Sequence, residues 1–198
     1  MKKSSSTTVW AFVLLFFCGC TKDNNISNPN TAELSGNWNF LGFQAETSST
    51  ATDDESGDIF TDVTTSAYTT IENGGTVNIS GFTMTGNGIT YGAVDTTLLM
   101  EYENNVFQDS MTTTLNFSIP PTNSVSTFEL IGSDSIHFTS QGLIATGSGP
   151  ASTGAKYSIS GNILTMTSNV VVDKIIDTLG ETIHQHETAK VVTTLQKQ

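Results

Sequence analysis

The stretch Leu34-Ser35-Gly36-Asn37-Trp38-Asn39-Phe40-Leu41 opens the folded part of the chain. Glycine lets the backbone turn sharply at the head of a first strand. A tryptophan two residues later can lie across one end of a sheet that closes on itself, where its large ring excludes water. Gly36 and Trp38 therefore predict a β-barrel with a plugged base, and Phe40 shares the inward face of Trp38.

The composition is that of an all-β protein. Thr, which favours strands, and Gly, Asn and Ser, which favour turns, are abundant, and long helix-forming runs are missing. Short segments of alternating apolar and polar residues recur along the chain. They predict an antiparallel barrel of about 8–11 strands, with a two-sheet β-sandwich as the alternative.

Several turns and interruptions are expected between these segments. Gly42 is expected to form a bulge in the first strand, and Pro120-Pro121 to stop a later one. Hairpin turns are predicted at Asn73-Gly74-Gly75, Asn87-Gly88, Gly132-Ser133-Asp134, Gly161-Asn162 and Leu179-Gly180.

The charge of the chain limits its partners. The net charge is -12 and there is no arginine. Nucleic acid is excluded as a partner, because phosphate backbones are bound by clustered Lys and Arg. The same deficit argues against a buried site for phosphate or carboxylate ligands.

Residues 1–19 have the pattern of a lipoprotein signal peptide. Met1-Lys2-Lys3 is positively charged, and Val9–Phe17 is apolar but too short to span a bilayer. Phe17-Cys18-Gly19-Cys20 resembles a bacterial lipobox, which implies cleavage before Cys20 and a lipid such as palmitate on its thiol. The alternatives are an ordinary secretory signal, or Cys18 and Cys20 as a metal or redox pair. The expected location is the bacterial cell envelope, anchored by lipid to the outer membrane on its periplasmic or surface face.

Beyond the anchor, residues 20–33 are polar and predict a flexible tether, and residues 34–198 form the β domain. Residues 47–58 are rich in Ser, Thr and Asp, which predicts a long first loop. The Gly-x-Trp start, this loop and the all-β remainder resemble the lipocalin-like domains of bacterial lipoproteins. The resemblance implies an up-and-down barrel that holds a small ligand or none known. It also implies a cation over the tryptophan, for which Lys190 or Lys197 is available.

The expected ligand site is the interior of the barrel, gated by the loop at 47–58. Its predicted lining consists of six apolar side chains, Phe40, Leu98, Met100, Phe117, Phe128 and Phe138. With the lack of basic residues, this lining predicts binding of a small neutral or apolar ligand. The alternative function is a surface adhesion or interaction module that binds glycan or protein through its loops.

No pattern predicts an enzyme or a cofactor. No serine stands in a nucleophile elbow, and no cysteine remains after the anchor. His184 and His186 have a spacing that can chelate zinc or copper, but their strand face is polar, so a solvent-facing pair is preferred and no metal is predicted. Asp53-Asp54-Glu55 with Asp58 lacks the spacing of a calcium loop and is interpreted as a solvated acidic loop.

One short pattern repeats, Asp followed by Ser or Thr and then an aliphatic residue or Thr. It resembles the O-glycosylation signal of certain Gram-negative envelope proteins, and turn chemistry explains it equally well. The candidate acceptor residues are Thr96, Ser110, Ser135 and Thr178.

Overall fold

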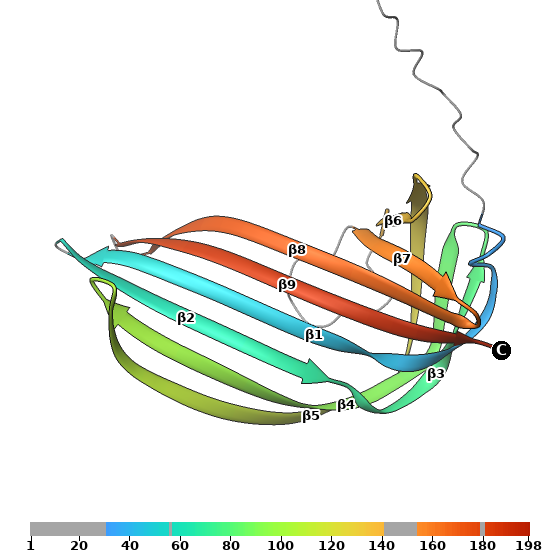
Figure 1. The fold of residues 1–198 in the computed structure, drawn as a ribbon, viewed down its shortest axis with the longest axis horizontal. Helices are drawn as coiled ribbons and strands as arrows, with labels where there is room; N and C mark the ends of the chain where they lie inside the picture. The colour runs from blue at the N-terminus through green and yellow to red at the C-terminus, as the bar shows by residue number, and fades with distance from the viewer. Residues whose placement is uncertain (1–30, 56, 141–153, 179–180) are drawn as a thin grey trace, which may run out of the picture.

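The computed structural model describes residues 31–55, 57–140, 154–178 and 181–198. Its nine strands belong to a single antiparallel sheet that closes in a barrel-like ring (Figure 1). The strands are β1 (Gly36–Glu55), β2 (Asp58–Thr69), β3 (Ile71–Ser80), β4 (Thr83–Glu103), β5 (Val106–Ile131), β6 (Ser135–Phe138), β7 (Gly154–Ser160), β8 (Ile163–Thr178) and β9 (Glu181–Lys197). The all-β antiparallel prediction is confirmed. The β-sandwich alternative is wrong, because all nine strands share one sheet.

The ring closes through a pairing of the first strand with the last. The strand order is β2-β1-β3-β4-β5-β6-β7-β8-β9, with further pairings of β1 with β9 and of β2 with β4. β2 and β3 together occupy one position in the ring, because β1 and β4 pair with both. Thr70 joins them, and its Oγ1 accepts a hydrogen bond from the Phe43 backbone N–H at 2.9 Å.

The ring has two halves of different construction. In the closed half, near the C-terminus, β6 and β7 lie between β5 and β8. β6 pairs with only Phe128–Ile131 of β5, and β7 with only Ile163–Thr167 of β8. Farther out, in the open half, the sheet order is β5-β4-β2-β1-β9-β8. There, residues 106–123 of β5 and 168–178 of β8 each have one edge that no described strand covers.

The closed half is filled by the hydrophobic core. Its largest fully buried side chains include Trp38, Phe128, Ile79, Met84 and Leu195, which come from β1, β5, β3, β4 and β9. Each large apolar side chain that is fully buried contributes about 1.5–3 kcal/mol. The core is therefore the main source of stability, and the open half lies outside it.

The bulge predicted at Gly42 is confirmed. The register between β1 and β9 shifts between Phe40 and Gly42, and Gly42 has a φ of 126°. A Cβ atom at this position would lie 2.6 Å from Thr70 Oγ1 and 2.6 Å from Asn73 Nδ2. Glycine is required here both for the backbone conformation and for the close approach of the β2–β3 junction.

We expect Gly42→Ala to destabilise the protein by about 2–3 kcal/mol, because a positive φ and a steric clash act together. Chemical denaturation monitored by circular dichroism measures this change. Gly57→Ala is the matched control, since Gly57 also has a positive φ, of 98°, but no atom within 4 Å of a built Cβ. Equal losses for the two variants would contradict the role of the clash.

The loop predicted at 47–58 is wrong. Residues 47–55 continue β1, where all of them pair with β2 and residues 47–52 also pair with β9, and β2 begins at Asp58. Ser and Thr are common in loops, but β-branched Thr also fits a pleated sheet well, and this favours the strand. No gating loop exists at this position.

The predicted turns have mixed outcomes. Gly132-Ser133-Asp134 and Gly161-Asn162 do connect strands, while Leu179-Gly180 lies outside the described residues. The turns predicted at Asn73-Gly74-Gly75 and Asn87-Gly88 are wrong, since these residues lie within β3 and β4 at register shifts.

Pro120-Pro121 does not stop a strand either, because β5 runs through it. The prolines face a register shift of β4, where Thr90 Oγ1 donates to the Ile119 carbonyl at 2.8 Å. Their other side is the edge of β5 that no described strand covers. A missing N–H is tolerated at both kinds of position.

Candidate functional site

The base of the ring is closed around Trp38, as the sequence predicts. Trp38 is 0% exposed, and its Nε1 donates to the Leu34 carbonyl at 2.8 Å. The expected cation is Lys197, whose Nζ lies 5.3 Å from the centre of the indole ring. Gly36 has a φ of 133° and lets β1 enter beside Lys197. The buried indole and the lysine over it therefore fill this end of the ring.

Three of the predicted cavity residues belong to the packed core instead. Phe40, Phe128 and Phe138 are 3%, 1% and 8% exposed and pack with other buried side chains of the closed half. A sequence pattern shows which side chains face inward, but it does not show whether they leave space between them. Phe117 is half-buried at the rim of this core.

Leu98 and Met100 are not interior residues, so their predicted place in the cavity lining is wrong. Tyr91 and Ala93 are buried against the core, and the register of β4 is regular from there to Glu101. Odd-numbered residues of this segment therefore face inward, and Leu98 and Met100 face outward. Their alternation was recognised correctly, but its direction was not.

The inner face of the open half is the surface that continues the core-lining side of the sheet. Strand register places its side chains in rows that cross β8, β9, β1, β2, β4 and β5 in that order. The row nearest the core consists of Val170, Ala189, Thr47, Ser66, Thr97 and Thr113. The next consists of Val172, Glu187, Ser49, Thr64, Leu99 and Met111, and the third of Lys174, Gln185, Ala51, Asp62, Glu101 and Asp109. This face combines hydroxyls, carboxylates and a few apolar side chains.

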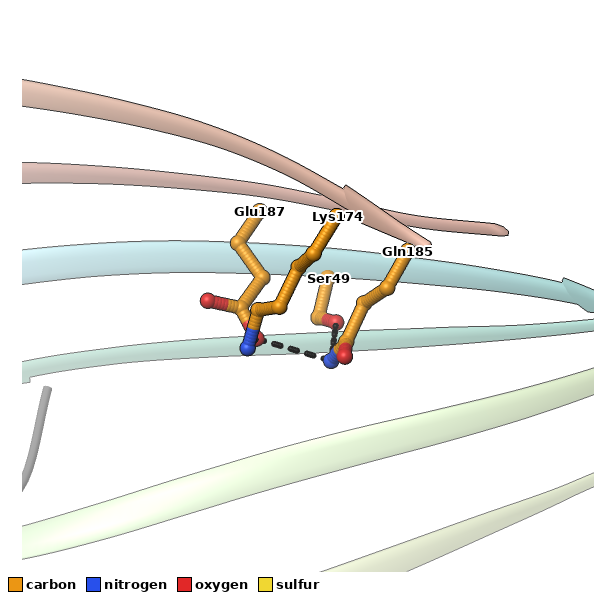
Figure 2. A network of polar contacts seen from close by, with 4 residues as sticks. All are labelled: Ser49, Lys174, Gln185 and Glu187. Carbon is orange, nitrogen blue, oxygen red and sulfur yellow. Dashed lines mark hydrogen bonds and ion pairs between the residues drawn. The ribbon is translucent and has the colours of Figure 1, made fainter. Parts of the chain in front are cut away.

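One wall of the inner face carries a polar network (Figure 2). Glu187 Oε1 accepts hydrogen bonds from Lys174 Nζ at 3.0 Å and from Gln185 Nε2 at 2.7 Å. Gln185 Nε2 also lies 3.2 Å from Ser49 Oγ, its acceptor on β1. These side chains point from β8, β9 and β1 toward the opposite wall. The positive charge of Lys174 is thus already paired within the protein.

Aromatic side chains and a carboxylate meet where the inner face joins the core. The ring of Tyr68 makes edge contacts with Phe43 at 5.9 Å and Phe117 at 5.6 Å between ring centres. Beside it, Asp95 Oδ1 accepts a hydrogen bond from Ser66 Oγ at 2.5 Å. Burial and then the charge of Asp95 raise the pKa of Tyr68, so its phenol stays neutral in any physiological buffer.

The opposite wall is acidic. Asp62, Glu101 and Asp109 pair side by side on β2, β4 and β5 and are exposed. Like charges at directly opposed positions destabilise a sheet. Asp53 lies one row farther out, and its Oδ1 is shielded from water without a hydrogen-bond partner among the described residues. The inner face therefore repels anions and attracts cations.

The two candidate metal-ligand histidines lie on the outer face of β9. Both are exposed, and His186 Nδ1 is 2.6 Å from Asp173 Oδ1 on the neighbouring strand. Within the described ranges, no three His, Cys, Asp or Glu side chains come together as a metal site. Of the acidic group at the first hairpin, Asp54 Oδ1 accepts from the Gly57 N–H at 3.1 Å and Asp58 Oδ1 from Asn104 Nδ2 at 3.0 Å. These contacts stabilise the turn.

The predicted glycosylation residues are spread over the surface. Thr96 and Ser110 are exposed on β4 and β5, and Ser135 is half-buried, with its hydroxyl 3.1 Å from Asp134 Oδ1. The side chain of Thr178 lies outside the described residues. The contact of Ser135 fits turn chemistry, whereas Thr96 and Ser110 lie within strands. Both interpretations of the pattern stay predictions.

A shallow depression of about 340 Å³ lies over β1, β8 and β9. Most of its lining consists of outward-facing residues, including the ion pair of Lys190 and Glu46 at 3.5 Å. Three inner-face residues, Thr47, Val170 and Ala189, also belong to this lining.

Sequence reasoning missed the residues that line the open half. The sequence analysis places none of Tyr68, Asp95 and Glu187 in the interior, because it predicts an interior that is apolar throughout. Every second residue of β4 counted from Tyr91 faces the same side, which places Asp95 inward. Tyr68 lies next to Asp95 across the β2–β4 ladder and therefore also faces inward.

Among the described residues there is no helix long and apolar enough to cross a membrane. In comparisons with known proteins, no family model matches the chain and no curated protein sequence matches it.

Proposed function

We propose that this protein is an envelope-anchored, non-enzymatic binding module whose inner face in the open half takes up a small uncharged or cationic ligand with an apolar body. The proposal is supported most by one observation. Beyond a filled core, the sheet extends as an inner face with exposed carboxylates; among its described residues carboxylates outnumber cations, and Lys174 is ion-paired with Glu187. The lipid anchor and the lipocalin resemblance rest on the sequence alone.

The chemistry of the inner face supports discrimination by charge. An anionic ligand would meet Asp62, Glu101 and Asp109 without a free cation to pair with. Burying an unpaired charge costs several kcal/mol, so anions are disfavoured. Leu99, Met111 and Leu115 supply apolar surface on the wall formed by β4 and β5, and the last two are 58% and 60% exposed. A ligand body that covers them removes this surface from water.

A matched ligand panel tests this function. Benzyltrimethylammonium, benzyl alcohol and phenylacetate share an aromatic body and differ in charge. We expect isothermal titration calorimetry to show binding of the cation and the alcohol, with phenylacetate about tenfold weaker or undetectable. Added salt should weaken binding of the cation only. Calorimetry is preferred to tryptophan fluorescence, because Trp38 lies at the closed base.

Tight, salt-insensitive binding of phenylacetate would contradict the proposed function. So would a complete lack of binding of all three compounds to a protein that circular dichroism shows to be folded.

A further inference from the structure

The junction between the core and the inner face brings a carboxylate, Asp95, close to the aromatic rings of Tyr68 and Phe117. Asp95 is half-buried there, and its carboxylate accepts a hydrogen bond from the Ser66 hydroxyl. It lies next to Tyr68 across the β2–β4 ladder, in which Ala67 pairs with Thr96. The carboxylate and the aromatic ring thus border the same part of the inner face.

Among the residues that the structure describes, no basic side chain forms an ion pair with Asp95. The sequence has no Lys or Arg from residue 23 to residue 155, which covers β1 to β6. Of the lysines that follow, Lys174 is ion-paired on the inner face, and Lys190 is ion-paired on the outer face. Lys197 lies over the tryptophan at the base, and Lys156 is exposed on β7 beside inward-facing Ala155. The negative charge is therefore left for a ligand to neutralise.

The neighbouring rings suit a cation. Tyr68 and Phe117 meet edge to face, with 85° between their planes, and both are half-buried. An ammonium group within about 6 Å of an aromatic face is attracted by the negative potential of the ring. Leu115 is paired directly opposite Asp95 and is 60% exposed, so it can cover the apolar part of the same ligand.

We propose that Asp95, Tyr68 and Phe117 form a subsite for an organic ammonium group, with Asp95 as its counter-ion and the two rings at its sides. This subsite rests on the proposed function and specifies which of the permitted ligands is favoured. A quaternary or tertiary amine suits it best, because such a group is weakly hydrated and contacts carboxylate and aromatic surface at once.

Two isosteric substitutions test the subsite in the full-length protein, with benzyltrimethylammonium as the probe and benzyl alcohol as the uncharged reference. We expect Asp95→Asn to weaken binding of the cation about tenfold or more and to leave benzyl alcohol unchanged. Asp109→Asn removes a carboxylate of the same face in a more distant row. It should weaken the cation by no more than about threefold, because solvent screens exposed charges.

A second variant covers the case that Asp95→Asn does not fold. Phe117→Leu keeps the carboxylate and the apolar character but removes one ring, and should weaken the cation about threefold to tenfold relative to benzyl alcohol. The proposal is overturned if folded Asp95→Asn or Phe117→Leu binds the cation as well as the unchanged protein does.

The failure of the subsite and that of the proposed function give different results. If the unchanged protein binds the cation and Asp95→Asn does too, the binding function stands and the subsite is wrong. If the unchanged protein binds neither compound, the proposed function fails and the subsite fails with it.

Discussion

Trp38→Ala is expected to lower the free energy of unfolding by about 3–5 kcal/mol, the range found for large aromatic residues removed from a core. Trp38 is fully buried and stands at the head of β1, opposite Val77 of β3 and Lys197 of β9. Its removal leaves a cavity at the point where the first and last strands close the ring. It also leaves the Leu34 carbonyl without its donor. Chemical denaturation followed by circular dichroism measures the loss.

Two further variants separate the contributions of Trp38. Trp38→Phe keeps an aromatic plug but removes the N–H, and should cost about 1–3 kcal/mol, because a buried carbonyl loses its partner. Lys197→Met keeps the length of the side chain and removes the charge over the ring, which should cost about 0.5–1 kcal/mol. A near-native stability of Trp38→Ala would show that the tryptophan does not hold the ring closed.

The closed half of the fold could be predicted well from the sequence. Gly36, Trp38 and Gly42 have local signals with a single physical meaning: a sharp turn, a large ring to bury and a bulge. The β7–β8 hairpin at Gly161-Asn162 is signalled equally clearly by alternating residues on both sides. In these places local propensity and tertiary packing favour the same structure, so the local sequence pattern is enough to predict it.

The open half could not be predicted, because its residues lack a single hydrophobic face. Residues 47–55 carry Ser, Thr and Asp on both sides of β1, so no alternation distinguishes this strand from a loop. Its conformation is set by pairing with β2 and β9, which are far away in the sequence or unrecognised as partners. In the closed half, Asn87-Gly88 shows the opposite error: a strong local turn signal lies within β4, where Asn87 pairs with Thr76 of β3.

The candidate site follows the same division. Carboxylates on the inner face look like ordinary surface residues in the sequence, and only strand register reveals that Asp62, Glu101 and Asp109 form one row. The acidic balance of the inner face was nevertheless predictable, because the lack of arginine and the scarcity of lysine hold for any arrangement of the chain. Composition thus predicted the charge of this face better than the alternation predicted its individual lining residues, while the preference for an uncharged or cationic ligand stays a prediction.

Cys20→Ser is expected to abolish membrane attachment. The lipobox prediction places the lipid on this thiol, and each acyl CH₂ group buried in the bilayer contributes about 0.8 kcal/mol to anchoring. Without the acyl chains, the acidic domain has no patch of Lys and Arg to hold it at an anionic membrane surface. The unchanged protein should sediment with membranes and incorporate an alkyne-tagged palmitate, whereas the variant should do neither.

Cys18→Ser is the matched control, because it removes the neighbouring thiol and keeps the Gly19-Cys20 junction. It should retain both the membrane fraction and the palmitate label. If Cys20→Ser remains membrane-bound and labelled, the lipid is not on Cys20. If both variants lose attachment equally, the two cysteines act as a pair, and the metal or redox alternative replaces the lipid anchor.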